Sequence, residues 1–124
     1  MRIFLAKVFV QFARKERITD TVLRDAVQRA EAGLIDADLG GGVIKQRIAR
    51  PGGGKSGGYR AIILFRRGSR TVFIYGFSKS QQDNIDQGEL REFREAAREI
   101  LGFSEADMDL AVKSNAFKEI MRDA

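Results

Sequence analysis

The stretch VIKQRIARPGGGKSGGYRAIILFRRGSRTVFIYGF, residues 43–77, holds three short apolar runs separated by glycine-rich or basic turns. The runs cover residues 43–49, 59–66 and 71–77, and they are rich in β-branched and aromatic side chains, which is typical of strands. Residues 67–70 read as a tight turn. The pattern predicts an antiparallel meander of three consecutive strands. The last two are apolar at nearly every position, so we expect both faces of the sheet to be partly covered.

On the N-terminal side, the sequence predicts one strand and two helices. Residues 2–5 can form a strand, and residues 7–17 carry apolar side chains at helical spacing before a basic end. Thr19 is a suitable N-cap for a second helix, and Gly33 is a suitable residue to follow its end. We expect the two helices to form an antiparallel hairpin whose apolar stripe lies on the sheet.

On the C-terminal side, the sequence predicts two further helices. Asp86 and Glu89 have the spacing of a capping box, and the helix that they begin should end near Gly102. Ser104 should begin a shorter final helix. The element order β-α-α-β-β-β-α-α predicts a single α+β domain over residues 1–124, in which the N-terminal strand joins the meander in a four-stranded sheet.

The segment GKS, residues 54–56, looks like the end of a P-loop, the glycine-rich turn that wraps nucleotide phosphates. The match fails, because Ala49 stands where the first glycine of that motif belongs. It also fails because Gly57 and Gly58 follow, where a P-loop needs the start of a helix. We therefore expect no nucleotide cofactor, and we interpret the segment as a flexible basic loop between two strands.

The composition excludes several kinds of site. The chain has neither cysteine nor histidine, which removes disulfides, zinc sites with Cys or His ligands, thiol nucleophiles and histidine bases. No paired carboxylates suggest another metal site, so we expect neither metal nor other cofactor. No apolar run approaches the ~20 residues of a membrane span, and the N-terminus does not resemble a signal peptide. A cytoplasmic protein without membrane contact is the expectation.

Positive charge is concentrated in the first part of the chain. The net charge is +5, but residues 1–70 hold 15 basic and 6 acidic side chains, whereas residues 71–124 hold 7 and 11. Between Asp38 and Asp83 there are nine basic residues and no acidic one. Because uncompensated like charges destabilise a fold, this stretch indicates an anionic partner, and nucleic acid is the commonest. An ordinary basic surface, or a surface for an acidic protein, remains open as an alternative.

Residues 33–85 resemble the toxins of the RelE/ParE superfamily, and within it the HigB/RelE-like subgroup. The likeness rests on GKSGGYR (54–60), on the strand end YGF-x-K (75–79) and on DNI (83–85). It implies a RelE-like α+β fold, a cognate helix-turn-helix antitoxin, and action on mRNA at the ribosome as an endonuclease that inhibits translation. The superfamily also contains ParE-type gyrase poisons without nuclease activity, so that function stays open beside a non-catalytic nucleic-acid-binding module.

The resemblance implies roles for four basic residues. Arg60, in the strand that begins G-Y-R, corresponds to the arginine that contacts the scissile phosphate in RNA-cleaving members. Lys45 and Arg47 occupy the preceding strand, where basic residues act as base or phosphate contacts. Lys79, just after the last strand, matches an acid or charge stabiliser. The expected catalytic residues are therefore Lys45, Arg47, Arg60 and Lys79.

The chemistry of the residues agrees with these roles. Cleavage by the 2′-hydroxyl of the RNA needs no metal, but it needs a proton acceptor, positive charge on the phosphorane and a proton donor. Without histidine, a lysine among other cations such as Lys45 is the candidate base. RelE itself has a stacking tyrosine near the position of Asn84 and Ile85, and Tyr59 or Phe77 can replace it only if it faces the groove. The expected nucleic-acid contacts are Arg50, Lys55, Tyr59 and Arg66.

Overall fold

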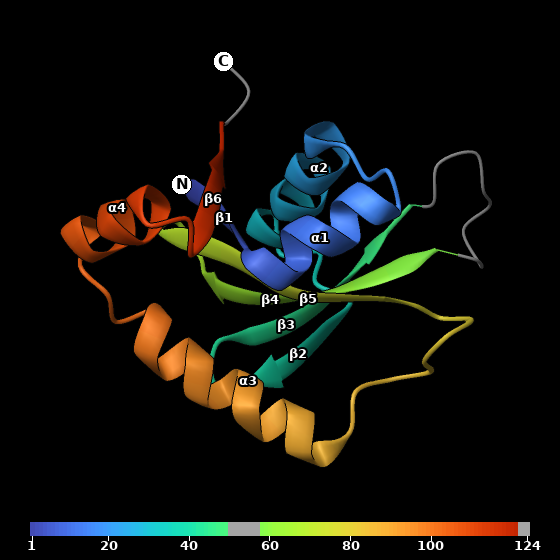
Figure 1. Ribbon diagram of the computed structural model, residues 1–124. Coiled ribbons are helices and arrows are strands. Elements are labelled where there is room, and N and C mark those ends of the chain that lie inside the picture. Colours follow the sequence, from blue (N-terminus) through green and yellow to red (C-terminus); the bar gives the residue numbers. More distant parts are fainter. Residues whose placement is uncertain (50–57, 122–124) are drawn as a thin grey trace.

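The computed structural model describes residues 1–49 and 58–121. Within these residues, six strands form one mixed sheet and four helices surround it (Figure 1). In chain order the elements are β1 (Arg2–Ala6), α1 (Lys7–Lys15), α2 (Asp20–Glu31), β2 (Ala37–Gly40), β3 (Val43–Ile48), β4 (Tyr59–Arg66), β5 (Arg70–Ser78), α3 (Gln87–Ile100), α4 (Glu105–Lys113) and β6 (Phe117–Ile120). The predicted α+β class is confirmed.

The predicted meander forms the centre of the sheet. The strand order is β2-β3-β4-β5-β1-β6, in which β4 is antiparallel to both β3 and β5, and β1 is parallel to β5. The expected four-stranded sheet is therefore present, but β2 and β6 extend it at both edges. These two strands are only four residues long, too short to show an alternating pattern. The last element of the described chain is thus a strand and not a helix.

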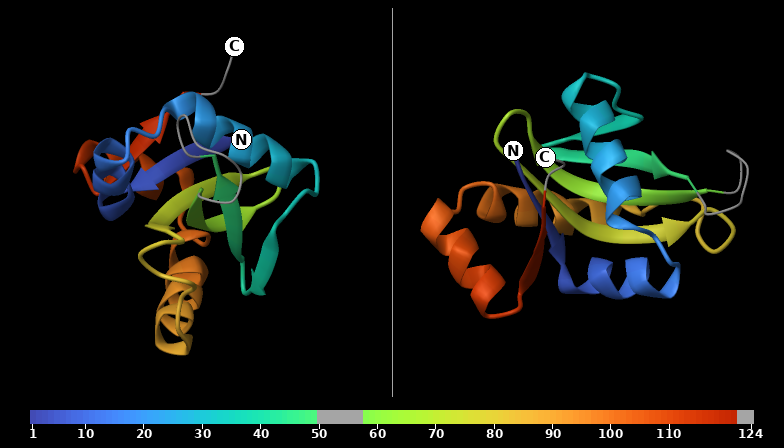
Figure 2. Two further views of the ribbon diagram at one scale, coloured as in Figure 1. Left: turned by 90° about the vertical axis from the view of Figure 1, so that its right-hand side faces the viewer. Right: turned by 90° about the horizontal axis from the view of Figure 1, so that it is seen from above.

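The helix boundaries follow the predicted capping residues. The Thr19 side chain accepts a hydrogen bond from the Val22 N–H, and capping boxes begin α3 at Asp86 and α4 at Ser104. These side chains satisfy backbone N–H groups that have no partner inside the helix. The right-hand view of Figure 2 shows that α1 and α2 run in different directions and do not lie side by side as a hairpin. The two helices pack on different strands: α1 packs mainly on β5, and α2 packs mainly on β3.

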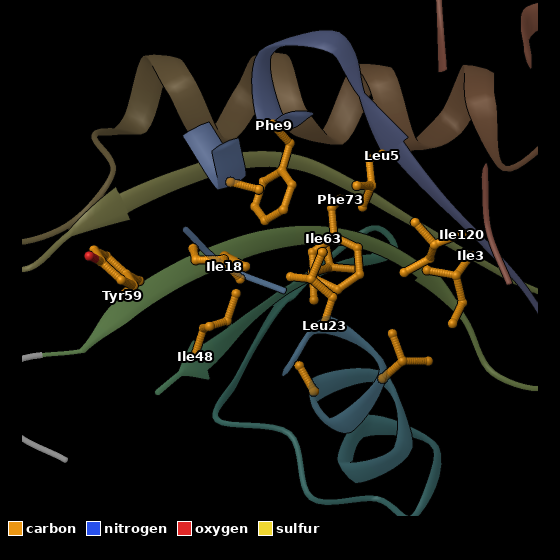
Figure 3. Close-up of a cluster of buried hydrophobic side chains, with 14 of the residues drawn as sticks. Ile3, Leu5, Phe9, Ile18, Leu23, Ile48, Tyr59, Ile63, Phe73 and Ile120 are labelled. Atoms are coloured by element: carbon orange, nitrogen blue, oxygen red, sulfur yellow. The ribbon is translucent and has the colours of Figure 1, made fainter. Parts of the chain in front are cut away.

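The first hydrophobic core lies between the sheet and the pair α1 and α2 (Figure 3). Phe9 packs on Phe73 with ring centroids 5.0 Å apart, and Leu23 of α2 is fully buried beside Ile63 of β4. Gly76 permits the close approach of α1, because a Cβ built at this position would lie 2.4 Å from the Phe12 ring. Any larger residue at position 76 would require the Phe12 ring, or α1 with it, to move.

The second core lies on the opposite face, under α3 and α4. It contains Phe4, Ile62, Leu64, Val72 and Met108, all fully buried. A β-bulge in the pairing of β4 with β5 interrupts strict alternation along β5. The expected covering of both sheet faces is confirmed.

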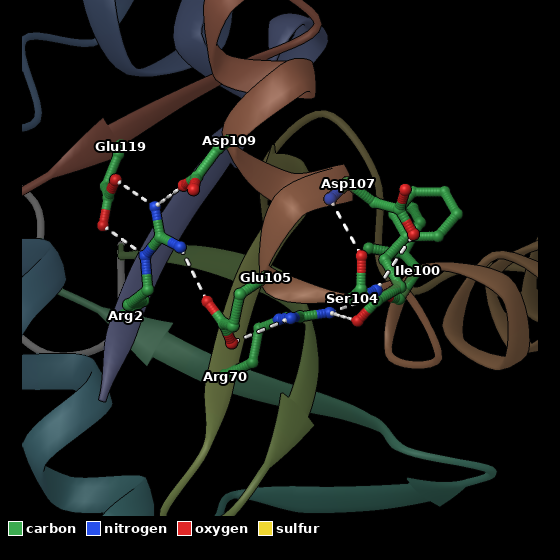
Figure 4. A network of polar contacts seen from close by, with 9 residues as sticks. Arg2, Arg70, Ile100, Ser104, Glu105, Asp107, Asp109 and Glu119 are labelled. Carbon is green, nitrogen blue, oxygen red and sulfur yellow. Dashed lines mark hydrogen bonds and ion pairs between the residues drawn. The ribbon is translucent and has the colours of Figure 1, made fainter.

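A network of charged side chains joins the C-terminal elements to the sheet (Figure 4). Arg2 of β1 contacts Glu105 at 2.6 Å, Asp109 at 2.7 Å and Glu119 at 2.8 Å. Arg70 is 4% exposed, and its Nη1 donates to the backbone carbonyls of Ile100 and Phe103, both at 2.9 Å. Arg70 therefore has a structural role, although it belongs to the acid-free basic stretch.

Among residues 1–49 and 58–121, no helix has both the length and the apolar character to cross a bilayer. The same residues contain no group of three or more acidic, histidine or cysteine side chains that could hold a metal ion.

Candidate nucleic-acid interface

The four expected catalytic residues gather at one end of the sheet. Antiparallel pairing places Arg47 of β3 directly opposite Arg60 of β4, and Arg60 opposite Phe77 of β5. Lys79 comes two residues after Phe77, and Lys45 comes two residues before Arg47, opposite Ile62. Because strand side chains alternate between faces, the strand residues lie on the face that α3 covers.

Arg47 and Arg60 carry like charges at directly opposed positions of the adjacent strands β3 and β4. Directly opposed side chains have Cβ atoms about 4.5–5.5 Å apart, and like charges at this separation are destabilising. Within residues 1–49 and 58–121, no acidic side chain forms an ion pair with Lys45, Arg47, Arg60 or Lys79. Arg60 contacts the Tyr59 carbonyl at 3.3 Å, and Arg47 and Lys79 are exposed. An anion between these cations would remove their repulsion.

Residues after β5 lie beside Lys45, through contacts that no local pattern of the sequence indicates. The Lys45 Nζ donates to Asn84 Oδ1 at 3.2 Å, and the same oxygen accepts from the Ile85 N–H at 2.9 Å. Gln82 in turn donates to the Asn84 carbonyl at 2.8 Å. The segment after β5 therefore folds back over β3 and holds the Lys45 amine in place.

Tyr75 is the aromatic side chain of this face that sequence reasoning overlooked. Its hydroxyl donates to Gln82 Oε1 at 2.9 Å, and its ring contacts those of Phe77 and Phe93. Burial, and secondarily the charge of Glu89, raise the pKa of Tyr75 above its ordinary value. The β-bulge places Tyr75 opposite Ile62, which is why simple alternation along β5 does not locate it.

Tyr59 and Phe77 do not offer the expected stacking surface. Tyr59 is 3% exposed, its hydroxyl donates to Glu16 at 2.7 Å, and its ring meets Phe12 edge-on. It precedes Arg60 by one residue, so it points to the opposite face, into the core under α1. This placement excludes Tyr59 from the face that carries Arg60. Phe77 lies on the correct face but is 4% exposed.

Of the remaining expected contacts, Arg66 is not brought to this end of the sheet. Arg66 is at the far end of β4, where it pairs with Arg70. It lies six positions after Arg60, which corresponds to about 20 Å along a strand. Arg50 and Lys55, and the basic loop that contains them, lie outside the described residues.

A shallow hollow adjoins the two opposed arginines. It has a volume of about 490 Å³, and Arg47 and Arg60 line it together with Thr21, Val22 and Asp25 from the start of α2. The hollow opens beside α2, on the side of the sheet opposite to α3, and reaches the two arginines at the ends of β3 and β4.

Comparison with known proteins gives one finding for this chain. A family model described as "RelE toxin of RelE / RelB toxin-antitoxin system" matches residues 1–120. A search of curated proteins found no significant match.

Proposed function

The chain belongs to the RelE toxin family, and from this premise we propose that it is a ribosome-dependent mRNA endonuclease that inhibits translation. As a toxin of a toxin–antitoxin system it has a cognate antitoxin as partner. We further propose that this antitoxin carries a helix-turn-helix, and that residues 1–124 act as a single toxin domain. We also propose that the chain is a member of the HigB/RelE-like subgroup of these toxins.

The observation that carries this proposal is the uncompensated basic cluster. Arg47 of β3 lies directly opposite Arg60 of the adjacent strand β4. Lys79 follows the next strand, β5, and Lys45 lies two residues before Arg47 on the same face of β3. A fold keeps like charges together at a cost, and a bound phosphate removes that cost. Single-stranded RNA supplies a regular series of phosphates to such a surface.

The cluster contains the groups that RNA cleavage requires. The 2′-oxygen attacks phosphorus, its proton leaves, and the bond to the 5′-oxygen breaks, which gives a 2′,3′-cyclic phosphate and a 5′-hydroxyl. In this scheme the Lys45 amine accepts the proton, and the Arg60 guanidinium binds the phosphate oxygens through two parallel hydrogen bonds. Arg47 adds charge stabilisation of the phosphorane, and Lys79 donates a proton to the leaving oxygen.

The test is to map RNA 5′ ends in cells after induction of the protein. The parent should create new 5′ ends inside translated messages, and the double variant Arg60→Ala/Lys79→Ala should create none. Lys113→Ala is the matched control, because it removes an exposed lysine of α4, which packs on the edge strand β6 on the far side of β5 and β1 from the site. Toxicity without new RNA ends but with broken DNA would replace the proposal by gyrase poisoning. Harmless expression of the parent would refute both.

A further inference from the structure

At Arg47, charged side chains and not a neighbouring strand cover the outer edge of β3. The ladder between β2 and β3 reaches only as far as the pair Ala37 and Lys45. Beyond it, the Arg47 N–H donates to a carboxylate oxygen of Asp36, and the Arg47 carbonyl accepts from Arg29 Nη2 at 2.6 Å. Two charged side chains therefore satisfy both backbone groups of Arg47, where an ordinary sheet would use a neighbouring strand.

These two side chains are themselves held in place. Arg29 Nε donates to Asp25 at 3.2 Å, and its Nη1 lies 4.0 Å from Asp36 Oδ2. The Asp36 N–H donates to Gln46 Oε1 at 2.8 Å. Gln46 is fully buried, and its amide nitrogen donates to the carbonyls of Ala26 and Leu34. The contacts on Arg47 thus continue into a buried polar network whose members have partners.

The outward direction of both Arg47 backbone groups shows which type of pair Arg47 forms with Arg60. Because both backbone groups of Arg47 bond to the outer edge, its pairing with Arg60 is of the non-hydrogen-bonded type. Side chains approach more closely in such pairs, with Cα atoms about 4.5 Å apart. Without the contacts from Asp36 and Arg29, the repulsion between the two guanidinium groups would favour fraying of β3 at its end.

We propose that Asp36 and Arg29 are positioning residues that hold Arg47 opposite Arg60. They touch the backbone of Arg47 and act on the RNA phosphate through it. The inference rests on the proposed function for its consequence in catalysis, whereas its structural part can be measured separately.

The structural part is tested by amide hydrogen exchange of the folded protein. In Asp36→Ala the Arg47 amide should exchange at least about tenfold faster, because a hydrogen bond to a charged acceptor is lost. The amide of Ile63, in the central strand β4, should keep its parent rate. Asp36→Asn keeps an acceptor oxygen and should restore most of the protection. Asp38→Ala is the matched control, since within the described residues the Asp38 side chain bonds only locally, to the Gly40 N–H. An unchanged Arg47 exchange rate in Asp36→Ala would overturn the inference.

The functional part is tested by a double-mutant cycle on ribosome complexes, measuring single-turnover cleavage. Asp36→Ala should lower the rate about tenfold in the parent and have no further effect in the Arg47→Ala background. Equal losses in both backgrounds would mean a general structural role and would overturn the inference. If the parent cleaves nothing, the proposed function fails. The cycle is then measured as affinity for an uncleavable 2′-O-methyl RNA, with the same two outcomes deciding.

Discussion

Arg60 and Arg70 stand on adjacent strands, and we expect opposite consequences when each is replaced by alanine. Arg60 is half-buried and touches only the neighbouring Tyr59 carbonyl among the contacts of the described chain, whereas Arg47 repels it from across the sheet. Arg70 is almost fully buried and bonds to two backbone carbonyls at the end of α3. The first arginine is therefore available to a ligand, and the second supports the fold.

The magnitudes follow from these contacts. Arg70→Ala removes two hydrogen bonds from a charged donor to part-buried backbone carbonyls, each worth about 1.5 kcal/mol at the low end. It also removes the contact with Glu105 at 3.1 Å, which adds little because the Glu105 carboxylate is exposed. The low end applies because the Arg70 Nε is buried without a partner in the described residues and already costs stability. The loss is about 3 kcal/mol, which for a chain of this size lowers Tm by roughly 10 °C. Arg60→Ala should change Tm by at most about 2 °C, since relief of repulsion offsets the lost contact.

The loss of cleavage activity should show the opposite order from the loss of stability, with the larger loss in Arg60→Ala. Arg60→Ala should lower the rate of mRNA cleavage on ribosomes about a hundredfold or more, which corresponds to about 3 kcal/mol of transition-state stabilisation. Arg70→Ala, measured well below its own Tm, should retain a rate close to that of the parent. Calorimetric melting and single-turnover cleavage of the three proteins decide the matter. Full activity in Arg60→Ala, or loss of activity only through unfolding, would refute the placement of the site.

Three further results are expected. Affinity for single-stranded RNA should fall with salt by about 0.7 log units per phosphate contact for each tenfold rise, and Lys79→Ala should reduce this slope by about one contact; an unchanged slope would place Lys79 outside the interface. Hydrogen bonds from Arg2, and to a lesser extent from Arg70, lower the pKa of the Glu105 carboxyl below its ordinary 4.5. The ionised carboxylate therefore stabilises the fold fully above pH 4.5, and this stabilisation is lost as the pH falls through the lowered pKa. Glu105→Gln should therefore flatten the decrease of Tm on acidification, and an acid limb identical to that of the parent would argue against the network of Figure 4. Gly76→Ala should cost about 1–3 kcal/mol, because its Cβ would lie 2.4 Å from a ring atom of Phe12; an unchanged Tm would mean that the Phe12 ring or α1 moves aside without cost.

Local signals in the sequence were sufficient for most elements of the fold. The capping residues Thr19, Asp86 and Ser104 mark the helix starts because a helix end depends on neighbouring backbone groups alone. The three strands of the meander are predictable because their apolar runs and turns are short-range features. Alternation along β3 also places Lys45 and Arg47 together on one face.

Only the tertiary structure decided which basic residues share a surface and which support the core. Because side chains alternate along β4, Tyr59 and Arg60 lie on opposite faces of the sheet. The sequence does not indicate which helix covers which face. The same basic stretch contains the exposed Arg47 and the buried Arg70, and their difference arises from the C-terminal end of α3, some thirty residues after Arg70. The contacts of Asp36 and Arg29 with the Arg47 backbone join segments that are 11 and 18 residues away from it. Such long-range contacts leave no periodic pattern, because each depends on how two elements pack and not on the order of residues within either.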